Sequence, residues 1–121
     1  MDIIITIPKK IEWSDYLKEI DAVRDGSQMM LYHLPFKPKH NLKGCRCFVC
    51  WRGHIVGWMR IVNVFYSDGF ACSTTGVRWP EGWYVCRSGE WTYLQPGIPM
   101  KGFQGIRYVT GELEEKINKL I

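Results

Sequence analysis

The stretch that decides the fold is "GCRCFVCWRGHIVGWMRIVNVFY", residues 44–66. Its two halves, 45–51 and 55–66, are rich in aromatic and β-branched side chains, which favour strands. The short segment "RGH" lies between them and has the composition of a tight turn. The stretch therefore predicts a β-hairpin of two long strands.

Four elements are expected before this hairpin. Residues 2–7 predict a short strand, and apolar residues at helical spacing predict a helix over 14–24, with Ser14 as its N-cap. Residues 28–34 predict another strand. Residues 35–44 are expected to form a basic loop, because two prolines in this segment oppose regular structure.

The chain after the hairpin predicts more strands and a final helix. Residues 67–82 are rich in turn formers and predict a long loop with a short strand in it, and residues 83–95 predict a second hairpin. Residues 96–105 predict a loop, 106–109 a last strand and 112–121 an amphipathic helix. The order predicts an α+β fold: a small, mixed, mostly antiparallel β-barrel with a helix after the first strand and another at the C-terminal end.

Length and composition indicate one globular domain over residues 1–121, since 46% of the residues are hydrophobic and 23% are charged. No apolar run approaches the ~18 residues that span a bilayer, so no membrane partner is expected. The first ten residues lack the basic region and cleavage site of a signal peptide, which favours a cytoplasmic location. Five cysteines cannot form a closed set of disulfides, which also fits a reducing compartment.

Three cysteines, Cys45, Cys47 and Cys50, crowd into the first strand of the hairpin and raise the question of a zinc site. Alternation along a strand puts Cys45 and Cys47 on one face and Cys50 on the other, so the three thiols cannot meet on one ion. We therefore expect no metal and no cofactor. Cys72 is the better exposed thiol, but no cysteine-hydrolase signature surrounds it.

The middle third of the chain has a one-sided charge. Residues 26–67 contain no Asp or Glu, six Lys and Arg residues, and all three histidines. This pattern favours a polyanion or an anionic ligand, although a solvated basic face would have the same composition. The residues expected to contact phosphates are Lys37, Lys39, Lys43 and Arg52.

Aromatic residues next to cations suggest where a base would bind. The segment "VRWPEGW" predicts a loop that carries Trp79 and Trp83, which are suited to stacking on a flat ligand or to covering the barrel end. Residues 98–108 combine polar side chains with glycines, which allow a backbone to approach a ligand closely. The residues expected to bind a base are Trp13, Arg78, Trp79, Trp83, Lys101, Phe103, Gln104 and Arg107.

The central hairpin resembles that of PUA-like domains, especially the EVE and ASCH branches. Gly44 and the "IVG" of residues 55–57 carry this similarity, and "GWYV", "WTYL" and "GIRYV" resemble the closing strands of such a barrel. The resemblance covers roughly residues 28–110 at the level of pattern. It implies a PUA-like pseudobarrel and binding of RNA or of a modified base, since many PUA-like domains bind RNA.

Three functions follow as hypotheses. The first is a non-catalytic module that binds RNA or DNA. The second is a small hydrolase similar to ASCH members that act on modified nucleosides, with Glu12 and Lys101 as acid and base candidates. The third is an interaction domain that uses its aromatic residues against another protein.

Overall fold

The computed structural model describes residues 1–26, 29–34, 36–71, 76 and 78–120. Its elements in chain order are β1 (Ile3–Thr6), α1 (Trp13–Arg24), β2 (Met30–Leu34), β3 (Arg46–Trp51), β4 (His54–Ser67), β5 (Phe70–Ala71), β6 (Arg78–Trp79), β7 (Gly82–Arg87), β8 (Thr92–Pro99), β9 (Ile106–Tyr108) and α2 (Gly111–Leu120). Among the described residues, neither helix is long and apolar enough to cross a bilayer.

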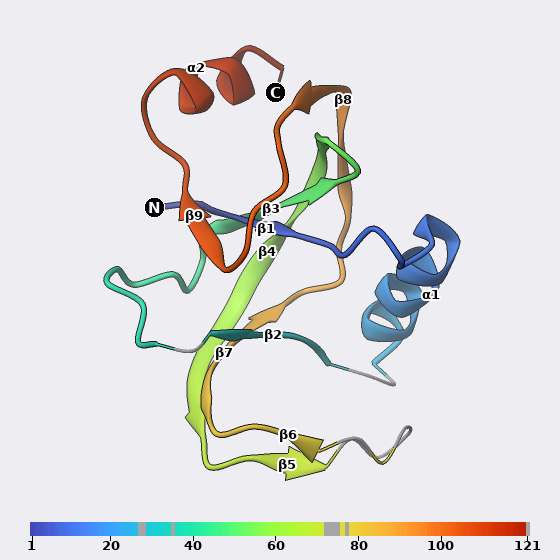
Figure 1. The fold of residues 1–121 in the computed structure, drawn as a ribbon, viewed down its shortest axis with the longest axis vertical. Helices are drawn as coiled ribbons and strands as arrows, with labels where there is room; N and C mark the ends of the chain where they lie inside the picture. Colours follow the sequence, from blue (N-terminus) through green and yellow to red (C-terminus); the bar gives the residue numbers. More distant parts are fainter. Residues whose placement is uncertain (27–28, 35, 72–75, 77, 121) are drawn as a thin grey trace.

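The main sheet is strongly curled and forms a half-barrel (Figure 1). Its strand order is β2-β7-β4-β3-β1-β9, with β8 also paired to β4. β1 runs parallel to β3, and the other pairs in this sheet are antiparallel. The prediction of an α+β fold built on a mixed, mostly antiparallel sheet is confirmed. The Tyr32 hydroxyl of edge strand β2 donates to the carbonyl of Gly105, just before the other edge strand, over 3.2 Å.

The predicted central hairpin is confirmed as β3 and β4, with Trp51 paired to His54 across a two-residue turn. Arg52 and Gly53 at the turn have φ values of 45° and 85°. Positive φ at both positions is typical of a tight turn whose twist matches that of the strands. β3 is the central strand of the fold, because β1 and β4 pair with its two edges.

β4 pairs with three strands. One of its edges pairs with β3, and its other edge pairs first with β8 and then with β7. The register shifts at Val56 in both the β3 and the β8 pairing, so this residue bulges out of both ladders. A second shift at Val62 bends the strand where it passes to β7.

The second predicted hairpin, over residues 83–95, is wrong. β7 pairs with β2 and β4, whereas β8 pairs with β4 and not with β7. The long β4 strand offers the same edge to both of them in succession. The connecting residue Gly89 is buried against Val23 of α1, where a Cβ would lie 2.7 Å from a methyl group.

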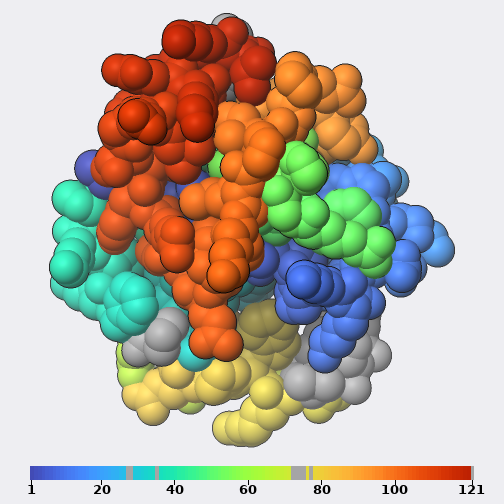
Figure 2. Space-filling view, turned by 45° about the horizontal axis from the view of Figure 1, so that its top comes forward, coloured from blue at the N-terminus to red at the C-terminus, as the bar shows by residue number. Residues whose placement is uncertain are grey.

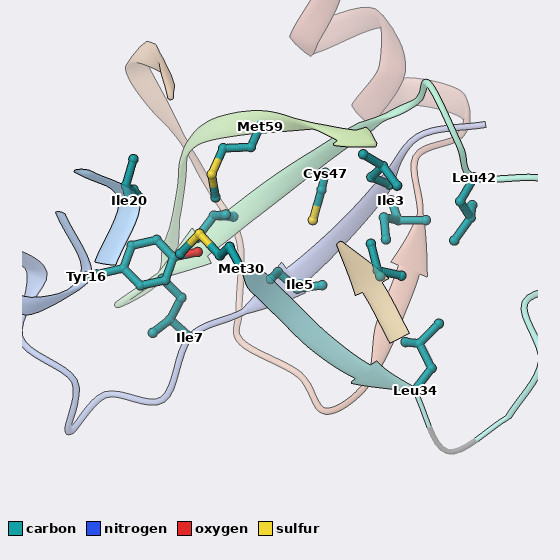
Figure 3. Close-up of a cluster of buried hydrophobic side chains, with 13 residues drawn as sticks. Ile3, Ile5, Ile7, Tyr16, Ile20, Met30, Leu34, Leu42, Cys47 and Met59 are labelled. Carbon is teal, nitrogen blue, oxygen red and sulfur yellow. The ribbon is translucent and has the colours of Figure 1, made fainter. Parts of the chain in front are cut away.

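Two hydrophobic clusters lie on the two faces of the sheet. The inner cluster contains Cys47 and Val49 of β3 together with Tyr16 and Ile20 of α1 (Figure 3). The outer cluster contains Phe48 and Cys50 of β3 together with residues of β8 and α2. β3 is therefore buried on both faces, which explains its continuous apolar run.

Several predicted boundaries also change. α1 has Glu12 at its N-cap, so Ser14 lies inside the first turn. β8 extends to Pro99, into the segment predicted as a loop, because its second half pairs again with β4. β5 and β6 form a two-stranded sheet where one short strand was expected.

We predict that Gly57→Ala destabilises the protein. An added Cβ would lie 2.4 Å from the Thr92 carbonyl oxygen and 2.4 Å from the Trp91 ring, so the packing there must shift. The free energy of unfolding, measured in urea, should fall by about 1–3 kcal/mol. The matched control is Gly102→Ala, whose Cβ meets a methyl group at 3.3 Å and which should change stability by about 0.5 kcal/mol or less. Equal stability of the two variants would contradict this packing.

Candidate functional site

The four expected phosphate-binding residues fall into two groups. Lys37, Lys39 and Lys43 lie in the loop between β2 and β3, whereas Arg52 lies at the tip of the β3–β4 hairpin. The six residues of β3 separate the end of this loop from the hairpin tip by about 20 Å. Figure 2 shows the teal loop and the green hairpin tip on different sides of the molecule.

The loop that carries the three lysines lies at one rim of the half-barrel and contacts two aromatic rings. The Lys37 ammonium is 5.6 Å from the centroid of Trp83. The Lys39 backbone amide donates to the Tyr108 hydroxyl over 3.2 Å, and the His40 ring lies edge-on to the Tyr108 ring. We call this surface the lysine rim and define it as Lys37, Lys39, His40, Lys43, Trp83 and Tyr108.

The inner core holds the loop of the lysine rim in place. Leu42 is 1% exposed and belongs to the inner cluster, so it anchors the loop from below. The backbone amide of Gly44 donates to Ile61 of β4 over 2.8 Å. Among the described residues, no carboxylate forms an ion pair with Lys37, Lys39 or Lys43. The three ammonium groups are therefore free to meet an anion.

The arginines of the acid-free segment have partners within the protein. Arg46 binds Asp2 through a 2.8 Å ion pair and through its backbone amide. Arg52 lies 3.5 Å from Glu12, and Arg60 donates to the Gly44 carbonyl. The three arginines therefore have partners within the protein, whereas the three lysines have no described ion pair. Counting charges along the sequence does not reveal this difference.

The segment 101–107 lies beside β1 and β2. Lys101 and Gln104 are exposed, and the Phe103 amide donates to the Thr6 hydroxyl over 3.3 Å. The Arg107 guanidinium lies 4.4 Å from the Phe103 ring centroid. In Figure 2 the orange segment that follows β8 runs toward the teal loop of the lysine rim.

Trp79 and Trp83 lie in β6 and β7, so their predicted loop is wrong. Trp79 stacks on Phe70 and contacts Tyr84, whereas Trp83 packs against Tyr66. Trp83 and Tyr84 are adjacent in β7 and point to opposite faces. The structure therefore does not bring Trp79 and Trp83 to one ligand. Arg78, next to Trp79 in β6, is exposed.

Trp13 lies apart from the other expected base-binding residues, at the start of α1. Its ring centroid is 5.3 Å from that of Trp51, and both rings line a pocket of about 240 Å³. Tyr93 and Gln95 of β8 also line this pocket, and the sequence analysis identified neither of them. The signal in the sequence is "QPG" at 95–97, which interrupts an otherwise strand-like segment.

Glu12 and Lys101, the acid and base candidates of the hydrolase hypothesis, do not form a pair. Glu12 is exposed at the N-cap of α1 and lies near Arg52. Lys101 is exposed after β8, and no described hydrogen bond or ion pair joins it to Glu12. Within the described ranges, no three His, Cys, Asp or Glu side chains cluster as a metal site would require.

The predicted division of the cysteines between two faces is confirmed. Cys47 belongs to the inner cluster and Cys50 to the outer one, while Cys72 lies outside the described residues. Burial raises the pKa of the Cys47 thiol to about 11, although the nearby Arg87 guanidinium opposes this shift. Arg87 is itself 4% exposed and donates to the Tyr16 hydroxyl over 2.8 Å, so it ties β7 to α1.

We predict that Cys47 resists alkylation in the folded protein. At pH 8 a thiol with a pKa near 11 is thiolate in only about one molecule in a thousand, and the thiolate is the reactive form. Iodoacetamide labelling followed by peptide mass spectrometry should modify half-buried Cys45 well before Cys47. In urea the two cysteines should react alike. Labelling of folded Cys47 as fast as Cys45 would contradict its burial.

Comparison with known proteins finds no matching family model, no similar curated protein and no similar solved structure. The resemblance to PUA-like domains stays a prediction.

Proposed function

We propose that this protein binds single-stranded nucleic acid through the lysine rim. The observation that carries the proposal is a loop whose three lysines have no ion-pair partner among the described residues. The loop contacts Trp83 through the Lys37 ammonium and Tyr108 through the Lys39 backbone amide. Proteins that bind single strands combine cations along the backbone path with aromatic rings for the bases. RNA is the expected form, from the resemblance to PUA-like domains.

The types of residue in the lysine rim favour phosphate contacts over base-specific ones. Lysine ammonium groups act as flexible point charges, which suits contact with phosphates in any sequence. The three lysines are spread over the seven residues 37–43, so they can meet successive phosphates rather than one. Binding of this kind depends steeply on salt, because counterions are released from the strand.

The surroundings of Trp83 provide a place for a base. Tyr66 packs edge-on against Trp83, with ring centroids 5.8 Å apart, and is 48% exposed. An unpaired base can stack on an exposed aromatic ring next to a phosphate-binding lysine. A strand that also reached Arg52 would have to run about 20 Å along β3.

We predict that the double variant Lys39→Ala with Lys43→Ala weakens binding to a fluorescent 12-nucleotide oligouridylate, measured by anisotropy. Each lost phosphate contact should lower the slope of log affinity against log salt by about 0.7, or about 1.4 for the pair. Thermal unfolding checks that the variant is folded.

The matched control removes the same charge elsewhere: Lys116→Ala with Lys119→Ala, two exposed lysines on α2. This control should bind nearly as the parent protein does. Equal weakening by the two double variants would show a general charge effect and contradict the lysine rim. The same oligomer as DNA tests the preference for RNA.

A further inference from the structure

The pocket beside α1 is created by an irregularity in the sheet. In the pairing of β8 with β4, Ile98 is opposite Ile55 and Tyr93 is opposite Gly57. Four residues of β8, 94–97, therefore face the single residue Val56. The extra residues interrupt the ladder between β4 and β8 beside a pocket of about 240 Å³, whose lining residues are Trp13, Trp51, Val56, Tyr93, Leu94, Gln95 and Gly97.

Aromatic rings that pack on one another form the walls of this pocket. The Trp91 ring lies 5.4 Å from Trp13 and 5.6 Å from Tyr93, edge-on to both. The Trp51 indole N–H donates to the Ile11 carbonyl over 3.2 Å, which fixes the orientation of that ring. These contacts orient the walls before any ligand arrives.

Polar groups are few and lie at the exposed side of the pocket. Tyr93 is 49% exposed, and Gln95 is also exposed. The Arg52 guanidinium lies 4.5 Å from the Trp51 ring centroid. Because Arg52 already covers this ring with a positive charge, the pocket disfavours a cationic ligand.

We infer that this pocket binds a free, flat heteroaromatic ligand of one or two fused rings, uncharged or carrying an anionic substituent. A nucleoside monophosphate has this chemistry. The pocket volume of about 240 Å³ is below the ~300–1,000 Å³ typical of sites for drug-sized ligands. This small volume limits the ligand to one or two fused rings. Gln95 can pair with the edge of such a ring, and an anionic substituent would compete with Glu12, 3.5 Å from Arg52, for the guanidinium. This site goes beyond the proposed function and lies at the other end of β3 from the lysine rim.

The test is a titration of ¹⁵N-labelled protein with adenosine 5′-monophosphate up to about 10 mM, where a ligand of millimolar affinity approaches saturation. The indole N–H resonances of Trp13 and Trp51 should shift in a saturable way. Those of Trp58 and Trp79, which lie outside both the pocket and the lysine rim, should stay in place. Absence of any shift, or equal shifts of all four resonances, would overturn the proposal.

Two variants locate the site. Val56→Phe fills the pocket and should lower the affinity for adenosine monophosphate about tenfold or more. Gln95→Ala changes only an exposed side chain and should leave the fold intact. This variant should also weaken binding, so it tests the pocket even if Val56→Phe fails to fold. Unchanged affinity in Gln95→Ala and in a folded Val56→Phe would count against the pocket.

Neither pocket variant should change oligouridylate binding at the lysine rim, and Lys39→Ala with Lys43→Ala should not change the titration with adenosine monophosphate. This crossed design separates failure of the pocket from failure of the lysine rim. Loss of both activities in every variant would contradict two independent sites.

Discussion

The pairing of β4 with three other strands is the constraint on which the rest of the structure depends. Its first half lies between β3 and β8, and its second half pairs with β7. Gly57 is opposite both Val49 and Tyr93, where a side chain would collide with Trp91. Because this position is a glycine, Trp91 packs onto the strand and contacts Trp13 of α1. This packing, together with the hydrogen bond from Arg87 to Tyr16, positions α1 beside the pocket.

The distribution of positive charge separates stabilising contacts from free groups. Arg46 is held by Asp2, and buried Arg87 donates to Tyr16, so both guanidiniums connect segments far apart in the chain. Burying a charge costs free energy unless hydrogen bonds replace its water shell, and the Arg87 Nε has no such partner among the described residues. The lysines of the rim form no such ion pair among the described residues. An external anion can therefore reach them with little competition from carboxylates of the protein, as it can the other exposed cations that form no described ion pair.

Local patterns in the sequence predicted the local elements well. The β3–β4 hairpin, the strand before α1 and the division of Cys47 and Cys50 between two faces follow from alternation and turn composition. The expected pairing within residues 83–95 failed, because sequence proximity favoured a hairpin whereas β4 offers a longer edge to both strands. Which strands pair is decided by contacts between residues that are far apart in the chain. The alternation of apolar and polar residues along one strand carries no information about those contacts.

The candidate sites were predicted only in part for the same reason. The basic loop and Trp13 were visible as composition, but the partners of the loop, Trp83 and Tyr108, come from β7 and β9. The pocket around Trp13 depends on a bulge in β8 that faces Val56, so its other lining residues had no local signal except "QPG".

The most direct test of the central claim is to map where a bound strand touches the protein. Ultraviolet crosslinking of oligouridylate, followed by mass spectrometry of the crosslinked peptides, reports this contact residue by residue. We predict crosslinks in the loop of residues 36–44 and at Trp83 or Tyr108, and we expect them to be lost at high salt as the phosphate contacts weaken. Crosslinks confined to α2 or to β5 and β6, with none in the loop, would contradict this prediction.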